Sequence, residues 1–228
     1  LSVVKCDHKE ELHKIAVVAT PSIGYDDLGD MYYYYPYMLD DVVYETTEYD
    51  YDEENDKYTF YIEEPTEGKI FFDIEPYRTF EIYLNDCTLS YLDDFTNMFS
   101  YLPSLKILDL GSLDTSNGWS FDYFISGNST LTDLRGLERL DFASGLTFFH
   151  FMDGDSSLSR VDLSNADFSN GLFFNSFLAH CSATEILLPT SNVMRGSMSN
   201  FLSWCSNVTS LNFIMVDISS SESLEGFL

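Results

Sequence analysis

Pairs of large apolar residues return through the second half of this chain at an almost constant spacing. The first members of six such pairs stand at positions 98, 124, 151, 177, 201 and 227, which gives steps of 26, 27, 26, 24 and 26 residues. A unit of this length is long enough for one strand and one short helix, but it is too short to bury its own apolar face. Each unit must therefore stack on its neighbours.

A second set of apolar positions predicts the strand of each unit. In the first unit Leu108 and Leu110 flank polar Asp109, and this alternation is the pattern of a half-buried strand. Similar runs recur along the chain, so we expect a parallel ladder of strands. The unit at residues 131–142 offers two strand registers, six residues apart. The predicted repeat core consists of Phe99, Leu105, Leu108, Phe124, Leu131, Phe151, Leu158, Val161, Phe177, Leu187, Phe201, Val208 and Leu211.

Polar segments, such as residues 114–118 and 167–171, connect each strand to the next apolar pair. They are rich in Asp, Ser, Asn and Gly, which cap helix starts and form turns, so we expect a short helix after each. The predicted fold class is α/β: a leucine-rich-repeat solenoid with short helices, preceded by a β-rich acidic cap or domain. We predict a boundary between residues 1–80 and 81–228, with about five repeats. The chain stops inside a repeat, which suggests truncation at its C-terminal end.

The repeats resemble a known family. Two copies read Phe177-Leu-Ala-His-Cys181 and Phe201-Leu-Ser-Trp-Cys205, and Leu187-Leu188-Pro189 ends one strand. This order is similar to the BspA-like leucine-rich repeats of bacterial and protist surface proteins, which also occur in mobile-element and viral proteins. The resemblance covers about residues 95–228 and implies an exposed binding or adhesive surface. The residues equivalent to the two cysteines in the other repeats are Leu102, Asn128 and Asp155.

The amino-terminal part differs in composition. Residues 1–100 hold 24 of the 38 acidic residues, 6 of the 11 basic ones and 14 of the 16 tyrosines. Short β-branched and aromatic runs at residues 14–19, 57–62, 69–74 and 79–84 predict strands. Ile82 lies 26 residues before Leu108, so the cap is expected to share a sheet with the first repeat.

Residues 40–56 contain nine carboxylates and no cation. We interpret this segment as a solvated acidic loop; the alternative is a calcium site, because calcium takes clustered oxygen ligands. The sequence suggests no cofactor other than calcium. The tyrosines of residues 32–37 fit either a strand with one buried face or a strip that stacks on glycans. The candidate carboxylates for a metal are Asp50, Asp52, Glu54, Asp153 and Asp155.

Cysteines and sequons give weaker signals. Cys181 and Cys205 occupy the same column of adjacent repeats, so they are either small core residues or a disulfide, and we favour the core interpretation. Cys6 and Cys87 are a second candidate pair. Asn128 and Asn207 begin N-glycosylation sequons, which matter only for a chain secreted through a glycosylating pathway.

The charge limits the function. A net charge of −27 and a pI near 4.1 argue against nucleic acid and anionic membrane as partners, and no segment is long enough to span a bilayer. Four separated histidines and the lack of catalytic motifs argue against an enzyme. We expect a non-enzymatic, extracellular or cell-surface recognition protein that binds protein or glycan through its repeat face. The alternatives are a fibre or virion-surface appendage subunit that stacks on copies of itself and, less favoured, an acidic glycan hydrolase.

Overall fold

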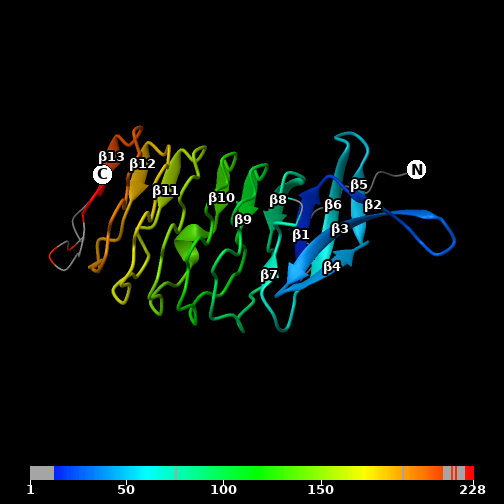
Figure 1. Ribbon diagram of the computed structural model, residues 1–228, viewed down its shortest axis with the longest axis horizontal. Coiled ribbons are helices and arrows are strands. Elements are labelled where there is room, and N and C mark those ends of the chain that lie inside the picture. The colour runs from blue at the N-terminus through cyan, green and yellow to red at the C-terminus, as the bar shows by residue number, and fades with distance from the viewer. Residues whose placement is uncertain (1–12, 75, 192, 213–216, 218, 220–223) are drawn as a thin grey trace.

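The computed structural model describes residues 13–228 except 75, 192, 213–216, 218 and 220–223. Figure 1 shows the turns of the chain side by side in a row, with the amino-terminal strands at one end. The strands are β1 (Lys14–Ala19), β2 (Ser22–Tyr25), β3 (Met31–Leu39), β4 (Val42–Thr46), β5 (Tyr49–Asp52), β6 (Lys57–Glu63), β7 (Ile70–Phe71), β8 (Thr79–Tyr83), β9 (Ile107–Asp109), β10 (Asp133–Arg135), β11 (Arg160–Asp162), β12 (Glu185–Leu187) and β13 (Ser210–Leu211).

These strands form three sheets. A mixed six-stranded sheet has the order β10-β9-β8-β1-β6-β5, a parallel three-stranded sheet has the order β11-β12-β13, and a four-stranded sheet contains β2, β3, β4 and β7. The predicted α/β class with short helices is wrong. Across the described part of the chain the one helical element is a 3-10 turn, Leu137–Arg139, and almost all regular structure is β.

Hydrogen bonds between neighbouring turns explain the missing helices. The N–H of Asn97 donates to the carbonyl of Asp122 at 2.9 Å, and that of Phe99 donates to the carbonyl of Phe124 at 3.0 Å. The same pattern returns one unit later, where Tyr123 donates to Phe149 at 2.7 Å. These donors are engaged across the stack, so they are not available to an α-helix, whose bonds run within one segment. Asn97 and Tyr123 also have positive φ values of 60° and 56°, which no α-helix accommodates.

The amino-terminal strands and the first repeat share one sheet, as predicted. β8 pairs antiparallel with β1 and parallel with β9. The parallel register places Glu81 beside Ile107 and Ile107 beside Asp133, in steps of 26 residues. The strand of the irregular unit is β10, so the earlier of its two candidate registers forms.

Two columns of phenylalanine rings run through the core. Phe95, Phe121, Phe148 and Phe174 stack at centroid distances of 5.2, 5.4 and 5.2 Å with nearly parallel planes. The second column runs through the predicted apolar pairs, and Phe151 stacks on the ring that follows it at 5.0 Å. Burying each ring contributes about 1.5–3 kcal/mol, and each aromatic pair adds about 0.5–1.5 kcal/mol. The first column repeats with the same period but was not singled out from the sequence.

Most residues of the predicted repeat core are buried, and one is misplaced. The buried residues are Phe99, Leu105, Leu108, Phe124, Leu131, Phe151, Leu158, Val161, Phe177 and Phe201. Val208 and Leu211 are partly buried against the core. Leu187 was predicted one position too late: Ile186 pairs with Val161 and points inward, whereas Leu187 pairs with Asp162 and is half-exposed. The chain is one residue shorter from Phe177 to Ile186 than from Phe151 to Val161, which shifts the register by one position.

The acidic segment at residues 40–56 is not a loop, so that interpretation is wrong. It forms β4 and β5, and β5 alternates Tyr49 and Tyr51 on one side with Asp50 and Asp52 on the other. Among the clustered tyrosines of β3, Tyr35 is buried against Phe60, and its neighbours are half-exposed. No helix in the described residues is long and apolar enough to cross a membrane.

Candidate functional site

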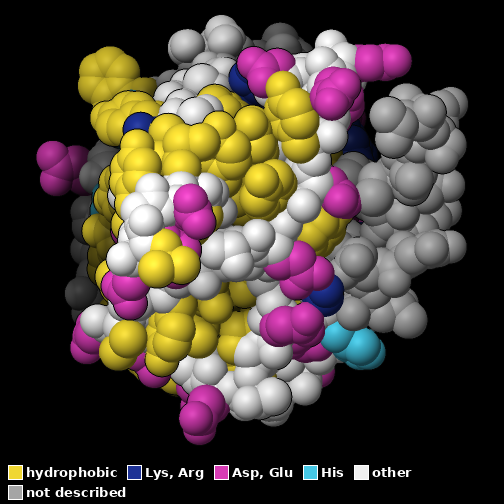
Figure 2. Space-filling view, turned by 90° about the vertical axis from the view of Figure 1, so that its right-hand side faces the viewer, with side chains coloured by type: hydrophobic (Ala, Val, Ile, Leu, Met, Phe, Trp, Pro, Cys, Tyr) yellow, Lys and Arg dark blue, Asp and Glu magenta, His cyan; other side chains and the backbone are white. Residues whose placement is uncertain are grey.

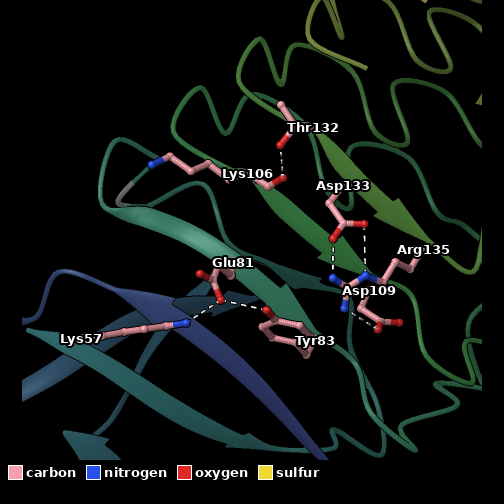
Figure 3. Close-up of polar contacts among 8 residues, drawn as sticks. All are labelled: Lys57, Glu81, Tyr83, Lys106, Asp109, Thr132, Asp133 and Arg135. Atoms are coloured by element: carbon pink, nitrogen blue, oxygen red, sulfur yellow. Dashed lines mark hydrogen bonds and ion pairs between the residues drawn. The ribbon is translucent and has the colours of Figure 1, made fainter. Parts of the chain in front are cut away.

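The outward side of the six-stranded sheet carries a row of mostly polar side chains, interrupted at β1 by the fully buried Ala16. The register places Tyr61 and Tyr83 on either side of Ala16, then Asp109 beside Tyr83, then Arg135 beside Asp109. We call this surface, with the outward residues of β11 and β12, the ladder face. Figure 3 shows its central part.

One network joins β6 to β8. The Nζ atom of Lys57 lies 2.8 Å from Oε2 of Glu81, and the hydroxyl of Tyr83 donates to the same oxygen at 2.8 Å. Burial raises the pKa of Tyr83 above its ordinary value, and the hydrogen bond to the Glu81 carboxylate raises it further. Tyr83 therefore stays a neutral donor at physiological pH, and Figure 3 shows its hydroxyl directed at Glu81.

A second network fixes Arg135. Its Nε donates to Asp133 Oδ1 at 3.0 Å, its Nη2 donates to the other oxygen of Asp133, and its Nη1 lies 3.8 Å from Asp109 Oδ2. The bidentate bond to Asp133 raises the pKa of Arg135. The bidentate bond to Asp133 and the longer contact with Asp109 orient the guanidinium while its side chain stays half-exposed.

The ladder is interrupted beside Arg135. β10 ends the six-stranded sheet and β11 begins the three-stranded sheet, and no hydrogen-bond ladder joins them in the described chain. After β10, Gly136 adopts a φ of 90° and the chain enters the 3-10 turn. This extra turn separates the strands and leaves a groove of about 230 Å³. The groove is lined by Thr132, Asp133, Leu134, Leu137, Glu138, Leu158, Ser159, Arg160 and Asp162.

Arg160 lines the far side of the groove. Its Nε donates to Glu185 Oε2 at 2.6 Å and its Nη2 donates to Asp162 Oδ2 at 2.7 Å. The groove therefore contains one arginine, Arg160, whose half-exposed side chain is held by two carboxylates, while Arg135 lies on the adjoining strand β10 outside the groove lining.

The ladder face is less acidic than the molecule as a whole. The register of its strands places four of the 11 cations and eight of the 38 carboxylates on this side. The cations are Lys14, Lys57, Arg135 and Arg160, and the carboxylates are Asp50, Asp52, Glu63, Glu81, Asp109, Asp133, Asp162 and Glu185. A ligand therefore meets less electrostatic repulsion here than an even distribution of charge would give.

Two histidines that the sequence separates come together on one carboxylate. Asp153 Oδ2 lies 2.6 Å from Nδ1 of His150, and Asp153 Oδ1 lies 2.8 Å from Nδ1 of His180. Tyr123 stacks on His150 at 4.7 Å, and Trp204 lies parallel to His180 at 6.3 Å. Asp153 and His180 are 27 residues apart, which is about one repeat. The repeat period could therefore have predicted that these two residues lie side by side in adjacent repeats.

A buried carboxyl lies beneath this cluster. Asp155 is fully buried; its Oδ1 accepts a hydrogen bond from the N–H of Asn128 at 2.9 Å, and its Oδ2 has no partner. Burial raises the pKa of Asp155 well above its ordinary value, and the neighbouring Asp153 charge adds to this shift.

The candidate metal ligands do not form a site. Oδ1 of Asp52 accepts the N–H of Glu54, and Asp50 accepts the hydroxyl of Tyr61 at 2.8 Å. Asp153 is occupied by the two histidines. In the ranges that the structure describes, no group of three or more His, Cys, Asp or Glu side chains could hold a metal ion. The calcium interpretation of Asp50, Asp52, Glu54, Asp153 and Asp155 is therefore not supported.

The cysteine and sequon predictions have different outcomes. Cys181 is buried, Cys205 is partly buried, and both are free thiols; Cys205 Sγ donates to the carbonyl of Leu178 at 3.0 Å. Cys87 is also free, and Cys6 lies outside the described residues. Glycosylation of folded Asn128 is contradicted, because its buried Nδ2 donates to Phe99 and Ile125 carbonyls.

Asn207 is exposed, so its sequon stays a prediction. Four residues of the ladder face were not named from the sequence: Lys57, Tyr83, Arg135 and Arg160. The available signal was alternation, because a residue next to a buried strand position points outward. Comparisons with protein-family models, with curated proteins and with solved structures each found no match.

Proposed function

We propose that this protein is a non-enzymatic recognition module, extracellular or at a cell surface, that binds a protein or glycan ligand through the ladder face. The observation that carries the proposal is the groove between β10 and β11, which Arg160 lines, with Arg135 beside it on the outward side of β10. Each guanidinium is fixed by two carboxylates, so a ligand that accepts hydrogen bonds from it loses little further side-chain entropy.

The chemistry of this groove suits polar ligands. Arginine and tyrosine are the residue types enriched at protein interfaces, and Tyr83 lies two strands away from Arg135 on the same face. Glycan hydroxyls and peptide carbonyls both accept hydrogen bonds from guanidinium groups, while the flanking carboxylates accept from ligand donors. The proposal therefore leaves protein and glycan as two outcomes of one test.

The test is a glycan array and a panel of extracellular proteins, both probed with the wild-type chain and with the double variant Arg135→Ala, Arg160→Ala. We expect binding to fall by about tenfold or more, because each lost charge-assisted contact contributes about 1.5–3 kcal/mol. Arg195→Ala is the control, since Arg195 is also an exposed arginine beside a carboxylate, Asp217, at 3.7 Å.

Retained binding of every ligand by the double variant would refute the ladder-face proposal. The double variant should melt close to wild type, because exposed ion pairs contribute little to stability. Equal loss of binding in the Arg195 control would also count against the groove, because it would show a diffuse charge effect.

A further inference from the structure

Two hairpins at the amino-terminal end bring their apolar sides together. In β2–β3, Ile23 pairs with Tyr33 and Tyr25 pairs with Met31, so these four side chains share one side. In β5–β6, Tyr51 pairs with Tyr58 on one side of the hairpin, with ring centroids 4.5 Å apart.

Tyr33 joins the two hairpins. Its ring centroid lies 5.4 Å from that of Tyr58 and 6.2 Å from that of Tyr49. The apolar sides of the hairpins therefore meet at this residue. We call the combined surface the tyrosine face; it consists of Ile23, Tyr25, Met31, Tyr33, Tyr49, Tyr51 and Tyr58.

The tyrosine face is exposed. Tyr25 is 68% exposed, Ile23 is 55% and Met31 is 53%, and Tyr51 is 44%. Figure 2 shows hydrophobic side chains gathered at this end of the molecule, with acidic side chains around and among them. Contiguous exposed apolar surface of this kind marks interaction sites, and tyrosine is enriched in them.

Both hairpin tips are acidic. Asp26, Asp27 and Asp30 lie at the turn of β2–β3, and residues 52–56 at the turn of β5–β6 hold four carboxylates. From residue 15 to residue 56 the chain has 12 Asp and Glu and no Lys, Arg or His. An apolar centre is thus bordered by negative charge, and the next cation along the chain, Lys57, lies on the other side of β6 and is paired with Glu81.

We propose that the tyrosine face docks a basic protein partner, whose surface has an apolar centre bordered by Lys and Arg. Complementary charge steers such a partner and fixes its orientation, and Arg also stacks on tyrosine rings. A second copy of this chain brings the same net charge of −27 and is repelled, as are nucleic acid and anionic lipid.

This docking does not rest on the ladder-face proposal. Along β6, Tyr58 and Phe60 point toward the tyrosine face, whereas Lys57 and Thr59 lie on the alternate side with Asp50. The two surfaces are therefore on opposite sides of the same strand, and variants on one leave the other intact.

The test uses two labelled synthetic peptides of equal length and charge as probes. One alternates Arg with Leu, and the other alternates Arg with Ser. Fluorescence anisotropy with the full chain measures both affinities at low and at physiological salt. We expect the Arg–Leu peptide to bind at least about tenfold more tightly, because its leucines bury apolar surface that serines cannot.

Two matched variants locate the site. Tyr25→Ser with Met31→Ser should abolish the preference for the Arg–Leu peptide. Leu172→Ser should retain it, because Leu172 has the same exposure as Met31, 53%, and belongs to the repeats. Both parent side chains are mostly exposed, so thermal melting should match wild type and verify folding.

Glu53→Gln with Glu54→Gln should weaken both peptides while leaving their ratio in place. Equal affinity for the two peptides would overturn the proposal, because charge alone would then explain binding. An unchanged preference in the Tyr25, Met31 variant would overturn it as well. Concentration-dependent self-association in sedimentation, abolished by that variant, would identify a second copy as the occupant and refute the basic partner.

Discussion

Replacing Asp155 by asparagine should stabilise this protein, and the gain should grow with pH. The carboxyl is fully buried and one of its oxygens has no hydrogen-bond partner. Its pKa is raised in the folded state, so the folded chain binds this proton more tightly than the unfolded chain does. The wild-type chain is therefore favoured below the ordinary carboxyl pKa, and it loses that advantage as the pH rises toward the folded pKa.

The magnitude has an upper bound. Protonating a carboxyl of ordinary pKa at pH 7 costs about 4 kcal/mol. The folded chain must either take up this proton or bury a charged carboxylate, so this cost limits how much Asp155 can destabilise the fold. Asn128, in the same column of the preceding repeat, shows that an amide fits such a position: its Oδ1 accepts the N–H of Leu102 at 2.9 Å. We expect Asp155→Asn to raise the free energy of unfolding by about 2 kcal/mol at pH 7.

Urea unfolding of wild type and Asp155→Asn between pH 5 and pH 8 measures the difference. Asp86→Asn is the control, because removing any charge from a molecule of net charge −27 relieves some repulsion, and Asp86 is exposed. An Asp155→Asn variant that shows the same change as Asp86→Asn at every pH would refute a role for the buried carboxyl. A gain that shrinks as pH rises would contradict the sign of the linkage.

Three further predictions test the stacked core and its cysteines. Phe151→Ala should lower the free energy of unfolding by about 3–5 kcal/mol, because it opens a cavity within a phenylalanine column. Urea unfolding measures this loss, and Phe173→Ala is the control, because the Phe173 side chain is 44% exposed. Equal losses in the two variants would contradict the prediction. Gly111→Ala should destabilise by at least about 2 kcal/mol, since the added Cβ would lie 2.2 Å from the Asn85 carbonyl oxygen at a φ of +52°; Gly29→Ala, at +83° with open space around it, should cost less. Burial raises the pKa of Cys87 and of Cys181 to about 12, so iodoacetamide should label partly exposed Cys205 before either of them. Mass spectrometry that finds Cys181 modified before Cys205 would reject this order.

The repeat spacing predicted where the ladder strands lie, but not how the segments between them fold. Asp, Ser and Asn suggested helix caps, yet these residues also form Asx turns. In the structure Asp114 Oδ1 accepts the N–H of Ser116 at 3.0 Å, and Asp167 Oδ1 accepts the N–H of Ser169 at 2.9 Å. A cap and an Asx turn use the same short-range bond. The carbonyls of the adjacent repeat then take the backbone donors that a helix would need, and that contact is not local in sequence.

The acidic strands show the opposite error, in which composition was given more weight than alternation. Residues 49–52 alternate Tyr with Asp, which is a strand pattern with one aromatic side. The nine carboxylates suggested a solvated loop, but in β5 the carboxylates all lie on one side. Asp50 is tied there by Tyr61 at 2.8 Å, while Tyr49 and Tyr51 pack against Tyr58 on the other side.

The distribution of charge makes the two proposed surfaces separable by ionic strength. Six of the described cations lie within 4 Å of a carboxylate: Lys14, Lys57, Lys69, Arg135, Arg160 and Arg195. Much of the positive charge of the molecule is thus already paired, and the excess of carboxylate includes the tips of β2–β3 and β5–β6. Binding of a basic partner at the tyrosine face should weaken steeply with added salt. Ligand binding at the ladder face should change much less, because fixed hydrogen bonds at short range are screened less than long-range attraction between unpaired charges.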